Sequence, residues 1–231
     1  MICSKLSIIM PVLDESAGID AALTALAPYR ERGAEVIVVD GGSRDDTRLR
    51  ALPSADYVLA AERGRATQMN AGSVVARGDV LLFLHADTLL PDKADALILG
   101  GLAESARVWG RFDVRFDRRG LHSLVALMMN IRSRLTGIAT GDQAMFATRA
   151  AFDCAGGFPS IALMEDVALS VRLKRIGRPL CIRACATTSA RRWRRHGMFR
   201  TIFLMWWLRL AYFFGADPAR LARRYGYACV E

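Results

Sequence analysis

The chain has 231 residues and a formal net charge of +9, from 32 lysines and arginines against 23 aspartates and glutamates. This length suits one large α/β domain or two small ones. The hydrophobic share of 52%, with ordinary glycine and proline content, argues against a disordered chain. The five cysteines form no C-x-x-C pair, which argues against a disulfide framework or a structural zinc site.

The amino terminus carries only a short apolar run at residues 6–10, which Pro11 stops. This pattern predicts a strand rather than a signal peptide, so we expect a cytoplasmic protein. The basic excess fits nucleic acid, an anionic membrane or phosphorylated small molecules. It gathers around one apolar segment near the carboxyl terminus, at Arg191, Arg192, Arg194, Arg195 and His196 before it and Arg220, Arg223 and Arg224 after it.

The first hundred residues alternate between strand and helix patterns. Apolar runs predict strands at residues 6–10, 35–39, 55–59 and 80–84, with helices at 19–26 and 65–75. This order predicts a parallel sheet with right-handed crossovers. No G-x-G-x-x-G follows the first strand, which disfavours a nicotinamide or flavin enzyme.

The second half of the chain shows a different pattern of polar and apolar residues. Residues 111–116 alternate between polar and apolar, which predicts a strand with one solvent-exposed face. A helix is expected over 121–135, a short strand over 144–146, and an amphipathic helix from Glu165-Asp166 to about Gly177. We expect one domain over 1–190, followed by a basic and apolar helical extension over 191–231.

The run at 80–84 leads directly into His85-Ala86-Asp87. Open α/β sheets place their ligands beyond the carboxyl ends of the strands. A carboxylate and an imidazole at that edge could hold a divalent metal and, through it, a phosphate. The simpler alternative is that Asp87 only caps the next turn.

Asp40-Gly41-Gly42-Ser43 follows the second predicted strand in the same way. The two glycines allow a tight turn and close approach of a ligand, and Ser43 with Asp46 resembles a capping box. Turn-and-cap chemistry accounts for the glycines and the serine. It does not require Asp40, whose carboxylate can accept hydrogen bonds from the N–H edge of a nucleobase.

Two helix starts also carry polar groups. Arg65 and Asn70 lie in the predicted helix that precedes residues 80–84, where they could bind a pyrophosphate and a base or sugar, or simply face solvent. Glu165 and Asp166 suit the first turn of a helix because of its dipole. A carboxylate in a cleft can also act as general base toward a sugar hydroxyl.

Together these segments resemble glycosyltransferase family 2, whose members are inverting sugar-nucleotide enzymes with the GT-A fold. The matching segments, in family order, are residues 7–15, 36–47, 64–72, 78–87 and the region of Glu165-Asp166. The resemblance covers roughly residues 6–179. It implies a Rossmann-like, mostly parallel α/β sheet flanked by helices, with an amphipathic, apolar helix at the carboxyl terminus.

The resemblance also implies a role for each matching residue in a hexosyltransferase that uses a nucleotide-diphosphate sugar. Asp166 is the general base, and Asp87 is the last acid of the D-x-D motif, holding Mg²⁺ or Mn²⁺ with His85 in the place of the first acid. The nucleotide sugar would be bound by Pro11, Glu15, Asp40, Arg65, Asn70, Ala86, Asp87, Asp142 and Glu165.

Two departures from the family pattern bear on the activity. His85 replaces an acid, which favours Mn²⁺ over Mg²⁺ or a direct phosphate contact. Ser189 replaces the glutamine of the processive Q-x-x-R-W motif, which argues against a polymerising synthase. Within the family, the compact chain is similar to small bacterial transferases associated with radical-SAM proteins and arsenosugar biosynthesis.

The segment 198–214 is apolar and interrupted by Arg200 and Arg209. It is marginal for spanning a bilayer of roughly 30 Å. Its basic flanks and tryptophans suit a helix at the membrane interface, and a helix packed on the sheet or at a homodimer interface fits equally. His196 could alternatively serve as a metal ligand.

Two other functions remain as alternatives. A nucleotidyltransferase normally has a glycine-rich, cationic loop after its first strand, and residues 11–16 contain neither glycine nor a cation. A non-catalytic module that binds nucleic acid or membrane explains the arginines, but leaves Asp40, Asp87 and Asp166 unexplained. We therefore expect no nucleic-acid partner, while the sugar, the nucleotide and the acceptor stay open.

Overall fold

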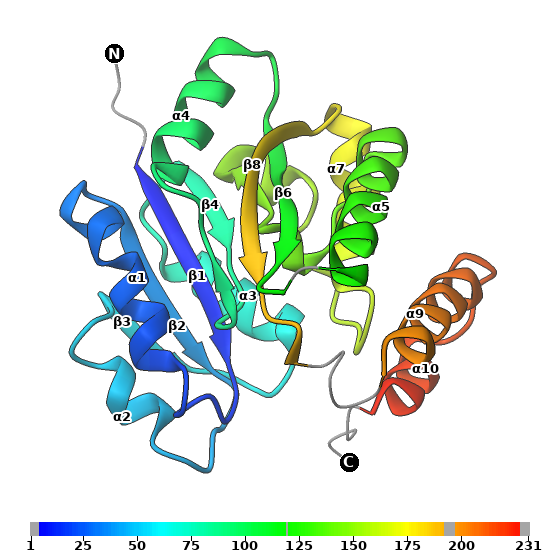
Figure 1. Ribbon diagram of the computed structural model, residues 1–231. Coiled ribbons are helices and arrows are strands. Elements are labelled where there is room, and N and C mark those ends of the chain that lie inside the picture. Colours follow the sequence, from blue (N-terminus) through cyan, green and yellow to red (C-terminus); the bar gives the residue numbers. More distant parts are fainter. Residues whose placement is uncertain (1–4, 119, 192–196, 227–231) are drawn as a thin grey trace.

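The computed structural model describes residues 5–118, 120–191 and 197–226, and Figure 1 shows their arrangement. One sheet has the strand order β3-β2-β1-β4-β7-β6-β8-β5. Its strands are β1 (Leu6–Val12), β2 (Glu35–Asp40), β3 (Tyr57–Ala60), β4 (Val80–Phe83), β5 (Thr88–Leu89), β6 (Trp109–Phe116), β7 (Phe146–Thr148) and β8 (Leu180–Thr188).

Helices flank this sheet and extend from it at the carboxyl terminus. They are α1 (Ile19–Glu31), α2 (Thr47–Ala51), α3 (Arg65–Val75), α4 (Ala94–Glu104), α5 (Leu121–Thr136), η1 (Gly141–Gln143), α6 (Arg149–Cys154), α7 (Glu165–Ile176), α9 (Met198–Phe213) and α10 (Pro218–Tyr225). The predicted mostly parallel α/β sheet is confirmed.

The amino-terminal half of the sheet is parallel throughout. β1 pairs with β2 and β4, and β2 pairs with β3, all in the parallel sense. Every residue of β2 is buried, as its unbroken apolar run requires. Because the carboxyl ends of parallel strands meet at one edge, Asp40 and the segment after β4 lie at the same edge of the sheet.

The other half of the sheet is mixed. β7 runs antiparallel to both β4 and β6, while β6 and β8 are parallel. The predicted solvent-exposed face of β6 is found only at Arg115, because α5 covers Arg111 and Asp113. Arg111 is fully buried, pairs with Asp113 and donates to the carbonyl of Asn130 on α5 at 3.2 Å.

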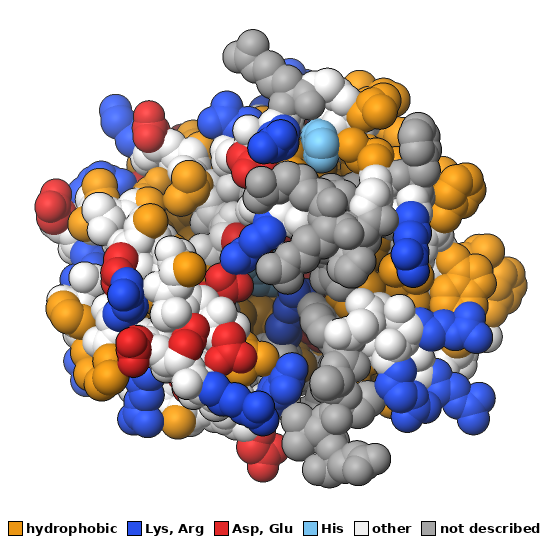
Figure 2. All heavy atoms as spheres, turned by 60° about the horizontal axis from the view of Figure 1, so that its bottom comes forward, with side chains coloured by type: hydrophobic (Ala, Val, Ile, Leu, Met, Phe, Trp, Pro, Cys, Tyr) orange, Lys and Arg blue, Asp and Glu red, His pale blue; other side chains and the backbone are white. Residues whose placement is uncertain are grey.

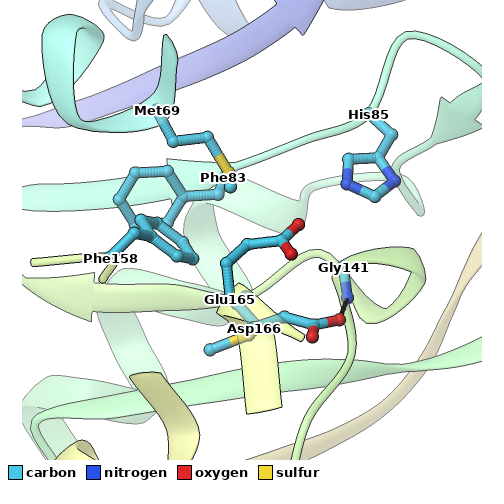
Figure 3. Close-up of a pocket in the computed structure, with 8 residues that line it drawn as sticks. Met69, Phe83, His85, Gly141, Phe158, Glu165 and Asp166 are labelled. Atoms are coloured by element: carbon cyan, nitrogen blue, oxygen red, sulfur yellow. Dashed lines mark hydrogen bonds between the residues drawn. The ribbon is translucent and has the colours of Figure 1, made fainter. Parts of the chain in front are cut away.

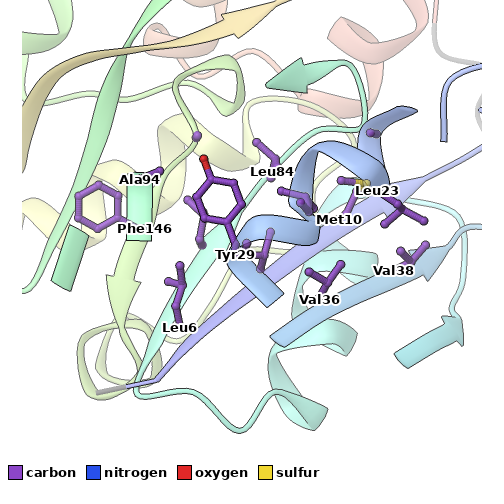
Figure 4. Close-up of a cluster of buried hydrophobic side chains, with 14 of the residues drawn as sticks. Leu6, Met10, Leu23, Tyr29, Val36, Val38, Leu84, Ala94 and Phe146 are labelled. Carbon is purple, nitrogen blue, oxygen red and sulfur yellow. The ribbon is translucent and has the colours of Figure 1, made fainter. Parts of the chain in front are cut away.

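Hydrophobic clusters fill both faces of the sheet. Alternate residues of β1 point to opposite faces, so that Met10 joins the cluster beneath α1 while Ile9 joins the cluster beneath α3 (Figure 4). Helix α3 lies close to the sheet because Gly72 has no side chain. A Cβ atom there would stand 2.5 Å from Cγ2 of Ile9 and 3.0 Å from Cγ2 of Val39.

Helices α9 and α10 form a third cluster with the segment that leads into α7. Leu208 is fully buried, and it packs with Leu163 and Met164 and with Leu221 of α10. The carboxyl-terminal helices thereby reach the start of α7. None of the helices in the described ranges is long and apolar enough to cross a membrane.

Candidate active site

A pocket opens at the edge of the sheet where the parallel strands end, and that face of the molecule is hollowed in Figure 2. Figure 3 shows the residues around it. Its walls are formed by Met69, Phe83, His85, Gly141, Met145, Phe158, Glu165 and Asp166. The fold thus brings three of the predicted site residues, His85, Glu165 and Asp166, into one pocket from segments about eighty positions apart in the chain.

Asp166 is held firmly at the start of α7. Its Oδ2 accepts a hydrogen bond from the N–H of Gly141 at 2.8 Å, and its Oδ1 accepts one from the N–H of Val167 at 2.7 Å. The preceding Met164 has a left-handed backbone (φ 70°), which sets the sharp entry into the helix. A carboxylate with two fixed oxygens and spare lone pairs can accept a proton from a group in the pocket.

Glu165 lies deeper, with only 6% of its side chain exposed, and its Oε1 is 4.0 Å from a guanidinium nitrogen of Arg65. Burial raises the pKa of Glu165, and the charge of Asp166 raises it further, although Arg65 and His85 oppose the shift. The folded protein therefore holds this proton more tightly than the unfolded chain does. The stabilisation is complete below the ordinary glutamate pKa, and it is lost as pH rises through the folded-state pKa.

Substituting Glu165→Gln is therefore expected to raise the melting temperature at pH 7, because glutamine removes a buried charge and keeps the shape of the side chain. Each kcal/mol gained should shift the midpoint by about 2–4 °C. The difference should shrink toward pH 4, where the native glutamate is already protonated. Thermal unfolding of both proteins between pH 4 and 8 measures this, with the exposed Glu62→Gln as control. A variant less stable than the native protein at pH 7 would show that the pairing with Arg65 outweighs burial.

His85 and Asp142 face each other across the pocket rim. The imidazole Nδ1 is 3.7 Å from Oδ1 of Asp142. Burial pushes the pKa of Asp142 upward, but contact with His85 and the charges of Arg65 and Arg209 hold it below its usual value. The turn that carries Asp142 is fixed by a capping box between Thr140 and Gln143.

A second group of predicted residues meets around Arg191. Its guanidinium Nη2 is 3.2 Å from both carboxylate oxygens of Glu15 and 3.8 Å from Oδ2 of Asp87. Ala86, between the two predicted metal ligands, packs against the hydrophobic core. One arginine thus joins the loops that follow β1 and β4, at the predicted place for the diphosphate.

Asp40 mainly fixes its own turn. Its carboxylate accepts hydrogen bonds from the hydroxyl and the N–H of Ser43 and from the N–H of Gly42 at 3.3 Å. The predicted capping box of Ser43 with Asp46 is wrong, because the serine hydroxyl bonds to Asp40 instead. Pro11 lies beside this turn, in register with Val39 of β2.

Both polar atoms of the Asn70 amide form hydrogen bonds within the protein. Its Nδ2 donates to the carbonyl of Phe158 at 2.8 Å, and its Oδ1 accepts from the N–H of Phe158 at 3.0 Å. It thereby fixes a residue of the pocket wall. Its predicted contact with the base or the sugar remains a prediction. Arg65, in contrast, is half exposed and faces Glu165.

Within the described ranges, no three His, Cys, Asp or Glu side chains converge as a complete metal site. Asp87 and His85 nevertheless provide a carboxylate and an imidazole on one short turn. Mg²⁺ and Mn²⁺ in transferase sites take few protein ligands and complete their coordination with substrate phosphates and water. The donor set therefore fits a cation held jointly with a diphosphate. His196, the alternative ligand, lies outside the described residues.

Sequence reasoning gave no role to two arginines near Asp166, which are Arg132 on α5 and Arg209 on α9. Burial lowers the pKa of both, to about 10 for Arg132, and the charge of Asp166 opposes the shift in each case. Arg209 interrupts an otherwise apolar helix, and this interruption is the feature of the sequence that could have indicated a role for it.

Comparison with known proteins identifies the family of the chain. Residues 7–158 match the family model described as glycosyl transferase family 2. Glucosyl-3-phosphoglycerate synthase of Mycobacterium tuberculosis is 28% identical over 96 residues, which are 37% of this chain and 30% of the relative. The same identity and coverage of this chain hold for the synthase of Mycolicibacterium paratuberculosis, of which 29% is matched. The chain thus spans about a third of the length of these relatives.

Solved structures share the fold at low identity. The crystal structure of S. aureus TarS 1-349 has a TM-score of 0.63 and 17% identity, covering 80% of this chain and 60% of that one. Glucosyl-3-phosphoglycerate synthase from Mycobacterium tuberculosis, in complex with Mg²⁺ and uridine diphosphate, has a TM-score of 0.60 and 18% identity, covering 80% and 70%. These relatives lend no support to the narrower arsenosugar-associated resemblance, so only the family is retained. The chain belongs to glycosyl transferase family 2.

Proposed function

We propose that the protein is an inverting glycosyltransferase that moves a hexose from a uridine-diphosphate sugar to an acceptor hydroxyl. The observation that carries the proposal is the carboxylate of Asp166, fixed by two backbone N–H groups in a pocket at the carboxyl edge of the sheet. TarS has been solved with UDP-GlcNAc, and the mycobacterial synthase with uridine diphosphate, which supports the choice of nucleotide.

The reaction follows from this placement. The acceptor hydroxyl gives its proton to Asp166 while its oxygen attacks the anomeric carbon from the face opposite the diphosphate. The new carbon–oxygen bond forms as the bond to the diphosphate oxygen breaks, so the configuration inverts and uridine diphosphate leaves. Arg191 and Arg65 are the cations placed to stabilise the charge that develops on the leaving group.

A bound divalent cation would supply further charge neutralisation at the diphosphate. Asp87 and His85 are the residues that would hold it. In this proposal Asp40 and Glu15 contact the uridine beside Pro11, while Ala86 and Asn70 shape the surrounding walls. Asp142 and Glu165 lie on the sugar side, with Asp142 kept anionic by its neighbours.

The two alternatives are weaker on this structure. A nucleotidyltransferase would need a cationic, glycine-rich loop after β1. In the loop here, the backbone N–H groups of Asp14 and Glu15 donate to the hydroxyls of Ser43 and Thr47 instead. A non-catalytic basic module would not require Asp166, Glu165 and His85 in one pocket.

Uridine diphosphate is expected to raise the melting temperature by about 5–10 °C at a hundred times its dissociation constant, because ligand binding contributes about 2.7 kcal/mol at that ratio. Part of the shift should require Mn²⁺ or Mg²⁺. The variant Asp87→Asn should lose this metal-dependent part and retain the rest, while the exposed Asp92→Asn should behave as the native protein.

Differential scanning fluorimetry with uridine, guanosine and adenosine diphosphates, with and without each cation, makes the measurement. A larger shift with a purine nucleotide would contradict the choice of uridine. No shift with any nucleotide would contradict the transferase proposal itself.

We also propose that the protein attaches peripherally to an anionic membrane, on the cytoplasmic side. Two helices turn apolar stripes to solvent, with exposed large residues at Leu121, Leu124, Leu127, Met128, Ile131 and Leu135 on α5 and Phe203, Trp206, Trp207, Leu210 and Phe213 on α9. We call these eleven residues the apolar stripes. Both follow helical spacing, and on α5 they lie opposite an inner side that buries Ala126 and Ser133.

Charge complementarity favours lipid over a second copy of the chain as the occupant. Arg200, Arg220, Arg223 and Arg224 are exposed on α9 and α10. Figure 2 shows hydrophobic side chains on this side of the molecule with basic side chains beside them. Tryptophan together with arginine is typical of surfaces that bind the membrane interface.

A further inference from the structure

Arg132 and Arg209 are half-buried near Asp166, and some of their guanidinium nitrogens lack the partners that buried donors normally have. The Nε and Nη2 atoms of Arg132 and the Nε atom of Arg209 are inaccessible to water, and each lacks a hydrogen-bond partner within the part of the chain that the structure describes. Buried polar groups are almost always paired, so unpaired guanidinium donors in a folded protein call for a ligand or another explanation.

Packing on both sides holds the two arginines in place. Arg209 follows Leu208, which is fully buried against Leu163 and Met164 at the entry to α7. Arg132 precedes Ser133, which is also fully buried, on the helix that Asn130 ties to β6 through two bonds of 2.9 Å with Val114. Neither arginine is a mobile surface side chain.

Nearby carboxylates act on the two arginines electrostatically. Both arginines interact with Asp166, Arg209 also interacts with Asp142, and Arg132 is repelled by Arg209 and Arg111. The two oxygens of Asp166 already accept from the N–H groups of Gly141 and Val167. Asp113, which could have compensated, is shared between Arg111 and Arg134. Asp166 and Asp142 therefore oppose these charges electrostatically, while the buried guanidinium nitrogens keep no hydrogen-bond acceptor among the described residues.

We infer that Arg132 and Arg209 form a subsite for an anionic oxygen group, a phosphate or a carboxylate, carried by the acceptor. The inference rests on the proposed function, in which Asp166 receives the proton of the acceptor hydroxyl. A group bound between these arginines would lie beside that hydroxyl. The donor diphosphate has a separate place at Arg191 and Asp87, at the ends of other strands.

The chemistry narrows the substrate class. Guanidinium groups bind phosphate and carboxylate oxygens through paired N–H donors. A neutral sugar alcohol brings only uncharged oxygens to these unpaired donors, whereas an acceptor with an acidic group close to its hydroxyl brings charged oxygens that guanidinium groups bind more strongly. The structure thus assigns the enzyme an anionic acceptor.

Calorimetric titration with inorganic phosphate, in the presence of saturating uridine diphosphate and Mn²⁺, tests the subsite. The native protein is expected to bind phosphate, and Arg132→Met and Arg209→Met are each expected to bind it about 10- to 100-fold more weakly. Uridine diphosphate affinity should not change in either variant. Arg200→Met, at an exposed position of α9, is the matched control and should bind phosphate as the native protein does.

Other outcomes would overturn either the subsite or the proposed function. Equal phosphate binding in the native protein and both variants, or none in the native protein, would remove the subsite. Competition between phosphate and uridine diphosphate would assign the arginines to the donor instead. If phosphate binds through both arginines while no nucleotide binds at all, the anion subsite stands and the proposed function fails. Should one methionine variant not fold, Arg132→Gln and Arg209→Gln, which also remove the positive charge, give the same comparison.

Discussion

Substituting Asp166→Asn is expected to lower kcat about 10²- to 10⁴-fold, the usual contribution of a positioned general base. Asparagine has nearly the same shape, yet it cannot accept the proton of the acceptor hydroxyl. Binding of uridine diphosphate should persist, because Arg191, Glu15 and Asp87 do not contact this carboxylate. Steady-state transfer assays, combined with nucleotide titration, measure the two effects separately.

Stability must be measured alongside activity. Only one end of an asparagine side chain can accept a hydrogen bond, so one of the bonds from Gly141 and Val167 is lost. Arg132 and Arg209 also lose the charge of Asp166, although Asp142 still opposes Arg209. A lower melting temperature is therefore expected, and the assays belong well below it. Asp153→Asn, an exposed aspartate on α6, is the matched control for both measurements.

Activity that survives in Asp166→Asn would assign the base elsewhere in the pocket. Glu165 is then the other carboxylate of the pocket wall, and its raised pKa makes its ionised form a stronger base than an ordinary carboxylate. Loss of nucleotide binding together with activity would instead place Asp166 in the donor site. These two results contradict different parts of the mechanism.

The parallel half of the fold was predictable because its signals are local. β1, β2 and β4 are unbroken apolar runs, and such runs alternating with helices admit few arrangements. The other half depends on contacts between distant segments. β6 appears half-exposed in sequence because its alternation does not reveal that Asn130 and Arg111 tie α5 over its polar side.

The residues of the site also fall into those that local motifs predict and those that depend on contacts between distant segments. His85, Glu165 and Asp166 could be proposed from the order of their motifs and from the edge at which strands end. No local pattern indicated that Arg191 would join Glu15 to Asp87. Arg191 and Glu15 are 176 positions apart in the chain. The amide of Asn70 and the carboxylate of Asp40 looked available in sequence, and their partners became visible only after folding.

The membrane proposal predicts a loss of binding when one of the apolar stripes is removed. The triple change Trp206→Ala, Leu210→Ala and Phe213→Ala affects side chains that are 61%, 58% and 81% exposed, so the fold should be unaffected. Burying each large side chain in lipid is worth about 1.5–3 kcal/mol. The variant should therefore bind vesicles containing phosphatidylglycerol at least about a hundredfold more weakly in a flotation assay.

The controls separate this surface from general stickiness and from self-association. Changing Leu49, Leu52 and Val74 to alanine removes side chains that are 67%, 56% and 82% exposed on α2, the turn after it and α3, and flotation should not change. Because the basic residues of α9 and α10 contribute about 1 kcal/mol each near an anionic surface, binding should weaken with salt and with neutral lipid. A chain that ignores every vesicle but dimerises, and becomes monomeric in the triple variant, would show that the apolar stripes pair with another copy and that the membrane proposal is wrong.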